Sequence, residues 1–236
     1  MSKRAIILAG GLGSRLRPYT VVLPKPLMPI GDYPILEVII RQLINHDFSH
    51  ITLAVNHQAD IIKAFFKDGS KWGINIDYSI EDRPLSTMGP LKLINDLPND
   101  FLIMNGDVLT DLNFSQLFNS HLDSRELFTI SAHERDQKID YGVLEVNDGY
   151  LTNFIEKPTK RYNVSMGIYI ANRGILDFIP ENKAYGFDNL MYDMLLYKRN
   201  VNVKKFNGYW LDIGRPDDYM QAIEEFDKMK SRFLEE

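Results

Sequence analysis

Short apolar runs alternate with helix-patterned segments through the first half of the chain. The runs at 4–9, 51–55, 74–80 and 101–105 are bounded by turn residues and have the length of buried strands. Between them, residues 35–44 and 61–66 carry apolar side chains at helical spacing. This order predicts an α/β fold, with a mixed, mostly parallel central sheet flanked by helices. Ligands of such a sheet bind beyond the carboxyl ends of its strands.

The second half of the chain is less regular. Strand-like runs at 127–132, 141–146, 151–155 and 164–171, with a tight turn at Asn147–Asp148–Gly149, predict a small β-rich insertion. Helix patterns follow at 175–179, 189–197 and 216–233. The apolar stripe of the last is expected to pack on the body, and the alternative is that it faces a partner subunit. No internal repeat is visible, so we expect one domain over residues 1–236, with no β-helix or regulatory domain.

Charge and cysteine content narrow the class of protein. The 236 residues include 27 Lys and Arg against 32 Asp and Glu, a net charge of −5, and no cysteine. This balance argues against nucleic-acid binding but permits a local cation cluster for a small anion. Without cysteine there is no disulfide or thiol chemistry. The apolar run at the N-terminus is too short for a signal peptide, and no stretch has the length of a membrane span. We therefore expect a cytoplasmic protein without a membrane partner.

The segment GGLGSR at residues 10–15 follows the first strand-like run directly. Backbone can approach a phosphate closely only where side chains are absent, and Gly10, Gly11 and Gly13 provide such backbone. A strand followed by glycines and a helix start also presents N–H donors to an anion. Arg15 adds a full positive charge in a geometry suited to phosphate. The alternative is an ordinary glycine-rich turn with a solvent-facing arginine.

Two common phosphate-binding motifs are excluded by the letters themselves. Leu16 occupies the position at which the dinucleotide motif GxGxxG needs its third glycine, and the GK[ST] of a P-loop is absent. Asp107, which follows the run at 101–105, is expected at the same edge of the sheet as the glycines. A carboxylate there is suited to Mg²⁺ or to a structural cap.

Several motifs occur together and in order. GGLGSRLRPYT is followed by PKPLMPIGDYPILE, and then by EDRPLSTMGPL, NGD, YGVLEV, EKP, MGIYI and YWLDIGRPDDY. This series strongly resembles the sugar-1-phosphate nucleotidyltransferases, also called nucleoside-diphosphate-sugar pyrophosphorylases, and its wording is nearest to the short mannose-1-phosphate guanylyltransferases. The resemblance covers about residues 5–219. It implies a Rossmann-like domain that transfers a nucleoside monophosphate from a nucleoside triphosphate to a sugar 1-phosphate, with Mg²⁺ as cofactor and pyrophosphate as the second product.

The resemblance also assigns roles at the nucleotide side. It implies that Arg15 grips the triphosphate, that Lys25 meets the phosphates from the other side, and that Asp107 and Asp212 bind Mg²⁺. The two aspartates are too far apart in sequence for spacing to pair them. Nucleotide contacts are expected from Leu8, Ala9, Gly10, Gly11, Gly13, Ser14, Arg15, Glu81 and Gly89.

On the sugar side, the resemblance implies contacts from Gly142, Glu156, Lys157 and Ser165, together with Lys25 and Asp107. Ser165 stands where many members have asparagine, so a heptose or an amino sugar is as open as mannose. Ser86 replaces the usual glycine of the nucleoside loop, and this change is expected to alter the shape of the loop.

Glu81 bears on the choice of base. A carboxylate accepts from both N1–H and N2–H of guanine, whereas uracil and thymine offer only N3–H on that edge, so Glu81 favours GTP. UTP, CTP and dTTP are the alternatives, and a surface role for Glu81 is equally open. A second function class is a non-catalytic nucleotide-sugar sensor on the same fold. The chain is expected to be a monomer or a homodimer.

Overall fold

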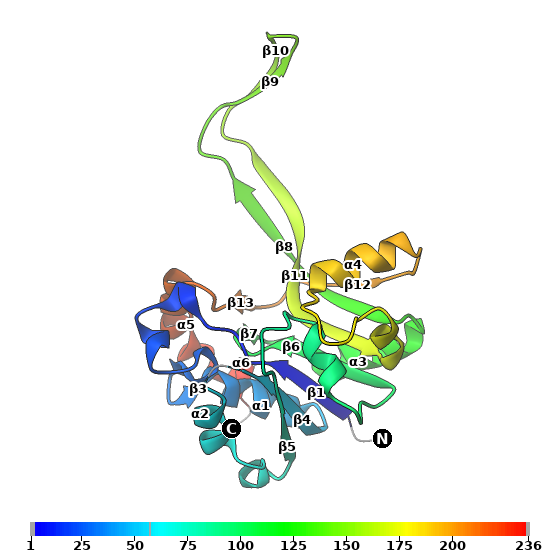
Figure 1. Cartoon of the computed structure of the whole chain (residues 1–236). Helices are drawn as coiled ribbons and strands as arrows, with labels where there is room; N and C mark the ends of the chain where they lie inside the picture. The colour runs from blue at the N-terminus through cyan, green and yellow to red at the C-terminus, as the bar shows by residue number, and fades with distance from the viewer. Residues whose placement is uncertain (1–2, 57, 235–236) are drawn as a thin grey trace.

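The computed structural model describes residues 3–56 and 58–234, which are built around one seven-stranded sheet (Figure 1). Four neighbouring strands run parallel, β11 runs antiparallel to both of its neighbours, and β12 is parallel to β8. The predicted α/β fold with a mixed, mostly parallel sheet is confirmed. The order across the sheet is β12 (Asn202–Phe206), β8 (Phe128–Lys138), β11 (Thr159–Asn172), β6 (Asp100–Asn105), β1 (Lys3–Leu8), β4 (Phe48–Val55) and β5 (Asn75–Ile80).

The central strands are apolar on both faces because each face carries its own core. In β1, Ala5 and Ile7 belong to one core and Ile6 to the other, as the two-residue period of a strand requires. The larger core lies under α1 (Ile35–Asn45), α2 (Ala59–Phe66), α3 (Phe114–Ser124), α5 (Pro216–Phe226) and α6 (Lys230–Phe233). The smaller lies under α4 (Phe187–Leu196) and the 3₁₀ turns Gly89–Leu93 and Arg173–Asp177. No helix in the described ranges combines the length and the apolar character needed to cross a membrane.

Two helix predictions need correction. The helix predicted over 216–233 is divided, since α5 ends at Phe226 and α6 begins at Lys230. The break allows the rings of Phe226 and Phe233 to stack, with centroids 5.7 Å apart and planes within 4°. The segment predicted as a helix at 175–179 is the 3₁₀ turn Arg173–Asp177. The apolar stripe does pack on the body, except for Ile223, which is 38% exposed.

The predicted insertion is a long β-ribbon that projects from the body (Figure 1). Its lower part is formed by β8 and β11, which stay paired out to Lys138 and Thr159. At its tip, β9 (Val143–Asn147) and β10 (Tyr150–Ile155) form a hairpin whose turn has positive φ at Asp148 (49°) and Gly149 (84°), as the sequence predicted. The strands predicted from the sequence were shorter than β8 and β11. The outer residues of both strands are mostly polar and exposed, so no apolar pattern marks them.

Short strands without an apolar pattern were also missed. They are β2 (Pro29–Ile30), β3 (Tyr33–Pro34), β7 (Val108–Thr110) and β13 (Trp210–Asp212), and the edge strand β12. Of these, β7 and β13 pair with each other in an antiparallel fashion and matter for the site.

Candidate active site

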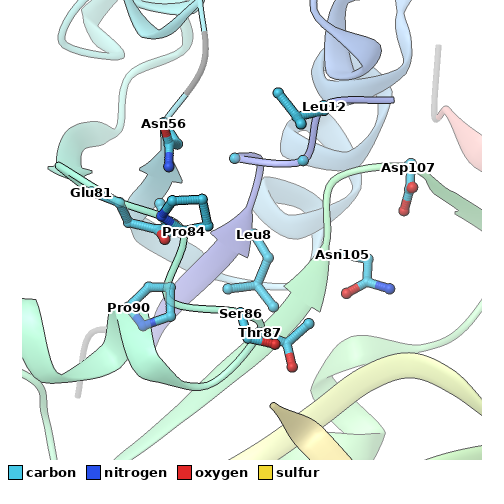
Figure 2. Close-up of a pocket in the computed structure, with 13 residues that line it drawn as sticks. Leu8, Leu12, Asn56, Glu81, Pro84, Ser86, Thr87, Pro90, Asn105 and Asp107 are labelled. Carbon is cyan, nitrogen blue, oxygen red and sulfur yellow. The ribbon is translucent and has the colours of Figure 1, made fainter. Parts of the chain in front are cut away.

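The carboxyl ends of the parallel strands meet at one edge of the sheet, and a cavity of about 390 Å³ lies there (Figure 2). A volume in this range is typical of small-molecule sites. The cavity is bordered by segments that follow β1, β4, β5 and β6. Its wall consists of Leu8, Gly10, Gly11, Leu12, Ala54, Asn56, Glu81, Pro84, Ser86, Thr87, Pro90, Asn105 and Asp107.

The glycine loop needs its glycines for two different reasons. A Cβ on Gly10 would lie 3.1 Å from the Glu81 Oε1 atom, so a side chain here would crowd the cavity wall. Gly13 has a φ of 59°, and a Cβ would lie 2.9 Å from the Thr20 Cγ2 atom. The carbonyl of Gly13 accepts from the Thr20 hydroxyl (2.7 Å) and from the Leu16 N–H (2.9 Å). These contacts fix the start of a 3₁₀ turn over Ser14–Leu16.

Not every residue predicted in this loop lines the cavity. The Ala9 N–H donates to the Ala54 carbonyl (2.8 Å), which ties the loop to β4. Ser14 and Arg15 lie on the 3₁₀ turn and are exposed. Leu8, Gly10 and Gly11 are in the cavity wall as predicted.

A charged cluster borders the cavity and shares Asp107 with it. The Lys25 ammonium forms an ion pair with Asp107, and both side chains are largely buried. Lys25 is held on a 3₁₀ turn, Lys25–Leu27, between Pro24 and Pro26, where the Met28 N–H donates to its carbonyl (3.0 Å).

Strand pairing brings Asp212 to this cluster. β13 pairs with β7 in a register that sets Asp212 opposite Val108, and the Ile213 N–H donates to the Asp107 carbonyl (3.0 Å). Gly214 then leaves room for Arg15, since a Cβ there would lie 3.2 Å from the Arg15 Nη2 atom and 3.3 Å from the Asp212 Oδ1 atom. The two cations and two carboxylates selected from the sequence therefore lie together in the structure.

The electrostatics of the cluster indicate room for another positive charge. Burial raises the pKa of Asp212, and the negative charge of Asp107 raises it further, while Lys25 and Arg15 oppose the shift. The Asp107 Oδ1 atom is buried and has no hydrogen-bond partner among the described residues. An unsatisfied carboxylate oxygen beside a second carboxylate is suited to a divalent cation. No group of three or more His, Asp or Glu in the described part of the chain is arranged to hold a metal, so such an ion would need phosphate oxygens and water as further ligands.

Glu81 is buried in the cavity wall, with 8% of its surface exposed. Its Oε2 atom accepts from the Leu85 N–H (2.9 Å), and its Oε1 atom faces Gly10. Burial raises the pKa of Glu81, and the Leu85 hydrogen bond opposes the shift. Gly89 lies outside the wall: its N–H donates to the Tyr185 carbonyl (3.0 Å), and a Cβ would lie 2.9 Å from the Leu85 Cβ atom. The structure therefore packs Gly89 closely against Leu85 and Tyr185.

The residues expected on the sugar side are divided between two places. Ser165 lies on β11, where the ribbon leaves the sheet, outside the cavity wall, with its hydroxyl 3.0 Å from the Tyr169 hydroxyl. Gly142, Glu156 and Lys157 lie on the projecting ribbon, exposed and outside the cavity wall. Figure 1 shows the ribbon directed away from the body. The structure therefore does not bring these three residues to the cavity of their own chain.

Sequence reasoning missed several wall residues. Asn56 stands at the end of β4, so the strand-end rule that selected Asp107 would have found it. Asn105, at the end of β6, was expected at this edge as part of the NGD motif but was given no role. Thr87 carried no signal of this kind. Ser86 was expected to change the shape of the loop. Its backbone has a φ of 66°, a left-handed conformation that glycine adopts without steric cost, so the serine keeps a conformation suited to glycine.

The fold and this site define the chain as an α/β protein with a charged cavity at the carboxyl ends of its parallel strands, and comparison with known proteins gives the family. A sequence model of the nucleotidyl transferase family matches residues 4–229, nearly the whole chain. The chain belongs to this family.

Relatives and solved structures agree with that assignment. The chain is 32% identical to a mannose-1-phosphate guanyltransferase of Yarrowia lipolytica and 34% identical to the catalytic subunit beta of a mannose-1-phosphate guanylyltransferase of Drosophila pseudoobscura, each over 93% of the chain. It spans about three-fifths of the length of these curated relatives (62% and 61%). Among solved structures, HddC from Yersinia pseudotuberculosis superposes with a TM-score of 0.75 at 28% identity, over 95% of this chain and 99% of that one. HddC has also been solved in complex with GMP-PN.

Proposed function

We propose that the protein catalyses Mg²⁺-dependent transfer of GMP from GTP to a sugar 1-phosphate, giving a GDP-sugar and pyrophosphate. The observation that carries this proposal is the convergence of Arg15, Lys25, Asp107 and Asp212 beside a cavity of nucleotide size. A sensor that only bound nucleotide sugars would have no need for two cations and two carboxylates at one point.

The chemistry follows from the charges of the reactants. An oxygen of the sugar 1-phosphate attacks the α-phosphorus of the triphosphate, and the bond from that phosphorus to the bridging oxygen of pyrophosphate breaks. Both reactants are anions, so their repulsion must be neutralised before they align. Arg15 and Lys25 supply positive charge, and the glycine loop supplies backbone N–H donors. Mg²⁺ held by Asp107 and Asp212 would add charge at the phosphate oxygens.

The choice of GTP rests on Glu81 and is supported by the relatives. A buried carboxylate in the cavity wall is an acceptor for the paired N–H donors of guanine. Both named relatives are guanyltransferases, and HddC was solved with GMP-PN. Nucleoside contacts would come from the cavity wall, and Gly89 would act by packing the loop.

On the sugar side, Ser165 would contact the sugar from β11. Gly142, Glu156 and Lys157 would provide close backbone approach, hydroxyl acceptors and a phosphate-binding cation. Mannose, a heptose and an amino sugar are the classes we propose, and the product would serve glycan biosynthesis in the cytoplasm.

The test crosses GTP, UTP, CTP and dTTP against a panel of sugar 1-phosphates with Mg²⁺ and detects the nucleotide sugar by mass. GTP is expected to give the fastest turnover. Turnover with UTP or CTP and none with GTP would overturn the base assignment alone, and no pyrophosphate release with any pair would overturn the catalytic one.

A second variant isolates the role of Glu81. Glu81→Gln keeps the shape but replaces one acceptor oxygen by a donor, so discrimination between GTP and UTP is expected to fall about tenfold, or ~1.4 kcal/mol. Glu37→Gln, buried on α1 and outside the cavity wall, is the control. An unchanged GTP preference in Glu81→Gln would remove this residue from base recognition.

A further inference from the structure

The projecting ribbon ends in a hairpin with one apolar face and no cover. We call residues 139–158 the arm, and residues 133–138 and 159–164 the stem. In the arm, Leu144 pairs with Phe154 and Val146 pairs with Leu151, so all four side chains share a face. They are between 53% and 61% exposed. A two-stranded hairpin is marginal on its own in water, and a contiguous exposed apolar face marks a binding surface.

The stem holds the arm away from its own cavity. β8 and β11 stay in register from Ala132 opposite Ser165 to Lys138 opposite Thr159. At about 3.3 Å per residue, the stretch from Ser165 to Thr159 carries the arm about 20 Å from the sheet. Across the stem, Arg161 forms a forked contact with Asp136, with N–O distances of 2.6 and 3.0 Å. Two parallel bonds of this kind stiffen a ribbon.

A second exposed apolar surface, which we call the rim, begins in the glycine loop and continues beyond it. Leu12, Tyr19, Val21 and Val22 lie in and after the glycine loop, and each is at least 53% exposed. Leu12 also forms part of the cavity wall. A single chain thus exposes two apolar surfaces, one beside the site and one on the arm, and neither is covered by the described residues.

We propose that two copies of this chain exchange arms, so that the arm of each copy covers the active site of the other. The apolar arm face would rest on the rim of the second copy, with Gly142, Glu156 and Lys157 directed at its charged cluster. This proposal rests on the proposed function for the role of those three residues. The site of one chain is then incomplete without the other.

Size and symmetry suit this arrangement. The arm has about twenty residues, close to the twenty to thirty that each partner contributes to a standard stable interface. A two-fold axis uses the same two surfaces on both copies and closes the assembly at a dimer. The alternative occupant is the chain's own rim, which the arm would reach only if the stem bent, for example at the irregularity of β11 between Ser165 and Tyr169.

Complementation separates these two cases. Lys25→Ala disables the body of one chain, and Glu156→Ala with Lys157→Ala disables the arm of another; each variant alone is expected to be nearly inactive. After the two are unfolded and refolded together, exchanged arms give each mixed dimer one site with an intact body and an intact arm, so about a quarter of wild-type activity should return. No activity beyond the sum of the two variants would overturn the proposal, as would full activity of the arm variant alone.

The mass in solution gives an independent reading that needs no substrate. Sedimentation of the wild type should give twice the chain mass, and Leu151→Asp on the arm face should give the single chain with an unchanged circular dichroism spectrum. Leu196→Asp, at an apolar position at the end of α4 that is more exposed than Leu151 (72% against 61%), is the control and should remain dimeric. A monomeric wild type, or a dimeric Leu151→Asp, would refute arm exchange. A dimeric wild type without turnover on any substrate would instead count against the proposed function.

Discussion

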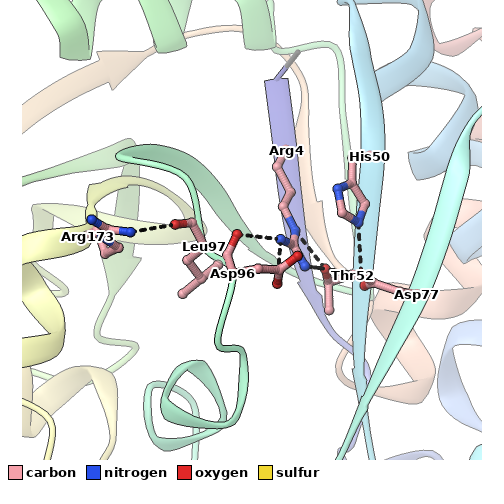
Figure 3. A network of polar contacts seen from close by, with 7 residues as sticks. All are labelled: Arg4, His50, Thr52, Asp77, Asp96, Leu97 and Arg173. Atoms are coloured by element: carbon pink, nitrogen blue, oxygen red, sulfur yellow. Dashed lines mark hydrogen bonds and ion pairs between the residues drawn. The ribbon is translucent and has the colours of Figure 1, made fainter. Parts of the chain in front are cut away.

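Two clusters of charged side chains lie at opposite ends of the parallel strands, one at the amino ends (the amino edge) and one at the carboxyl ends (the carboxyl edge). They are built differently. At the amino edge, all three guanidinium nitrogens of the buried Arg4 donate, to the Thr52 hydroxyl, the Asp77 carboxylate and the Asp96 carbonyl, at 2.8 to 3.1 Å (Figure 3). His50 Nε2 lies 2.8 Å from the same Asp77 oxygen. Arg4 Nη1 also lies 2.9 Å from the Asp96 Oδ1 atom, and this side-chain hydrogen bond holds the pKa of Asp96 below its ordinary value.

At the carboxyl edge, the charged groups are not all paired with one another. The Arg15 side chain has no hydrogen-bond or ion-pair partner within the described residues, and one oxygen of Asp107 is unpartnered. Burial and Asp107 raise the pKa of Asp212, so its ionised form is short of compensation. In the amino-edge cluster, the polar groups of Arg4 are all paired within the protein. In the carboxyl-edge cluster, Arg15 and one oxygen of Asp107 are left without partners among the described residues, so the cluster can bind an anion and a cation from outside. The comparison predicts that the first supports stability and the second supports turnover.

The largest expected effect is on turnover at the carboxyl edge. Lys25→Ala removes a cation from the cluster, and kcat/KM is expected to fall about 10²- to 10³-fold, a loss typical of removing one charge-stabilising group. Because Lys25 forms an ion pair with the largely buried Asp107, a modest loss of Tm is expected beside the loss of turnover. Lys205→Ala on the exposed β12 is the control, and the readout is pyrophosphate release beside a thermal melt. If Lys25→Ala lost its fold and not its turnover per folded molecule, the carboxyl-edge cluster would be a stability cluster like the one at the amino edge.

The next effect is on stability at the amino edge. Arg4→Met leaves Asp77 and Asp96 without their cation, and the free energy of unfolding is expected to fall by about 2–3 kcal/mol, below the full value of a buried pair because both carboxylates reach solvent. Urea titration measures the loss, and kcat per folded molecule should be unchanged. Arg173→Met, which gives up a single bond to the Leu97 carbonyl, should cost less than about 1 kcal/mol. Equal costs for the two variants would show that the Arg4 network adds nothing.

Glu81, at the carboxyl edge, should make the stability of the protein depend on pH. Its folded pKa lies above the ordinary 4.5, so the folded state disfavours the ionised form and stability is lost as pH rises from 4.5 through the folded pKa. Glu81→Gln does not titrate, so its Tm should gain on that of the wild type as pH rises through this window. Melts at several pH values test the sign, and a constant difference would mean that Glu81 is not strained by burial.

The smallest effect concerns backbone in the cavity wall. Ser86 holds a φ of 66°, which costs a non-glycine residue about 1–2 kcal/mol, so Ser86→Gly should raise the free energy of unfolding by about 0.5–1 kcal/mol. Ser120→Gly, inside α3, should instead lower it by up to about 0.5 kcal/mol. Opposite signs in denaturant titration are the expected result. A loss in both variants would mean that the serine side chain is itself needed in the wall.

The sequence determined whatever depends on local pattern. The parallel strands, the glycine loop after β1 and the Asp148–Gly149 turn each have a signature in neighbouring residues, because side-chain period and left-handed backbone are local properties. The ordered motifs indicated the family, and through it the charged residues of the site. Pattern failed along the stem, where exposed polar residues carry no period that marks a strand.

Tertiary structure alone decided what depends on distant pairing. Asp212 meets Asp107 because β13 pairs with β7, a contact between short strands that no local signal announces. Glu81 is buried because the turn that follows it and the remote glycine loop both pack against its carboxylate, at Leu85 and at Gly10, and hydrophobic patterning does not register a buried carboxylate. The direction of the arm likewise follows from the continued register of β8 and β11 beyond the sheet. The local sequence decides where charged side chains and glycines stand along the chain. Only the packing of remote segments decides which other groups lie opposite them in the folded protein.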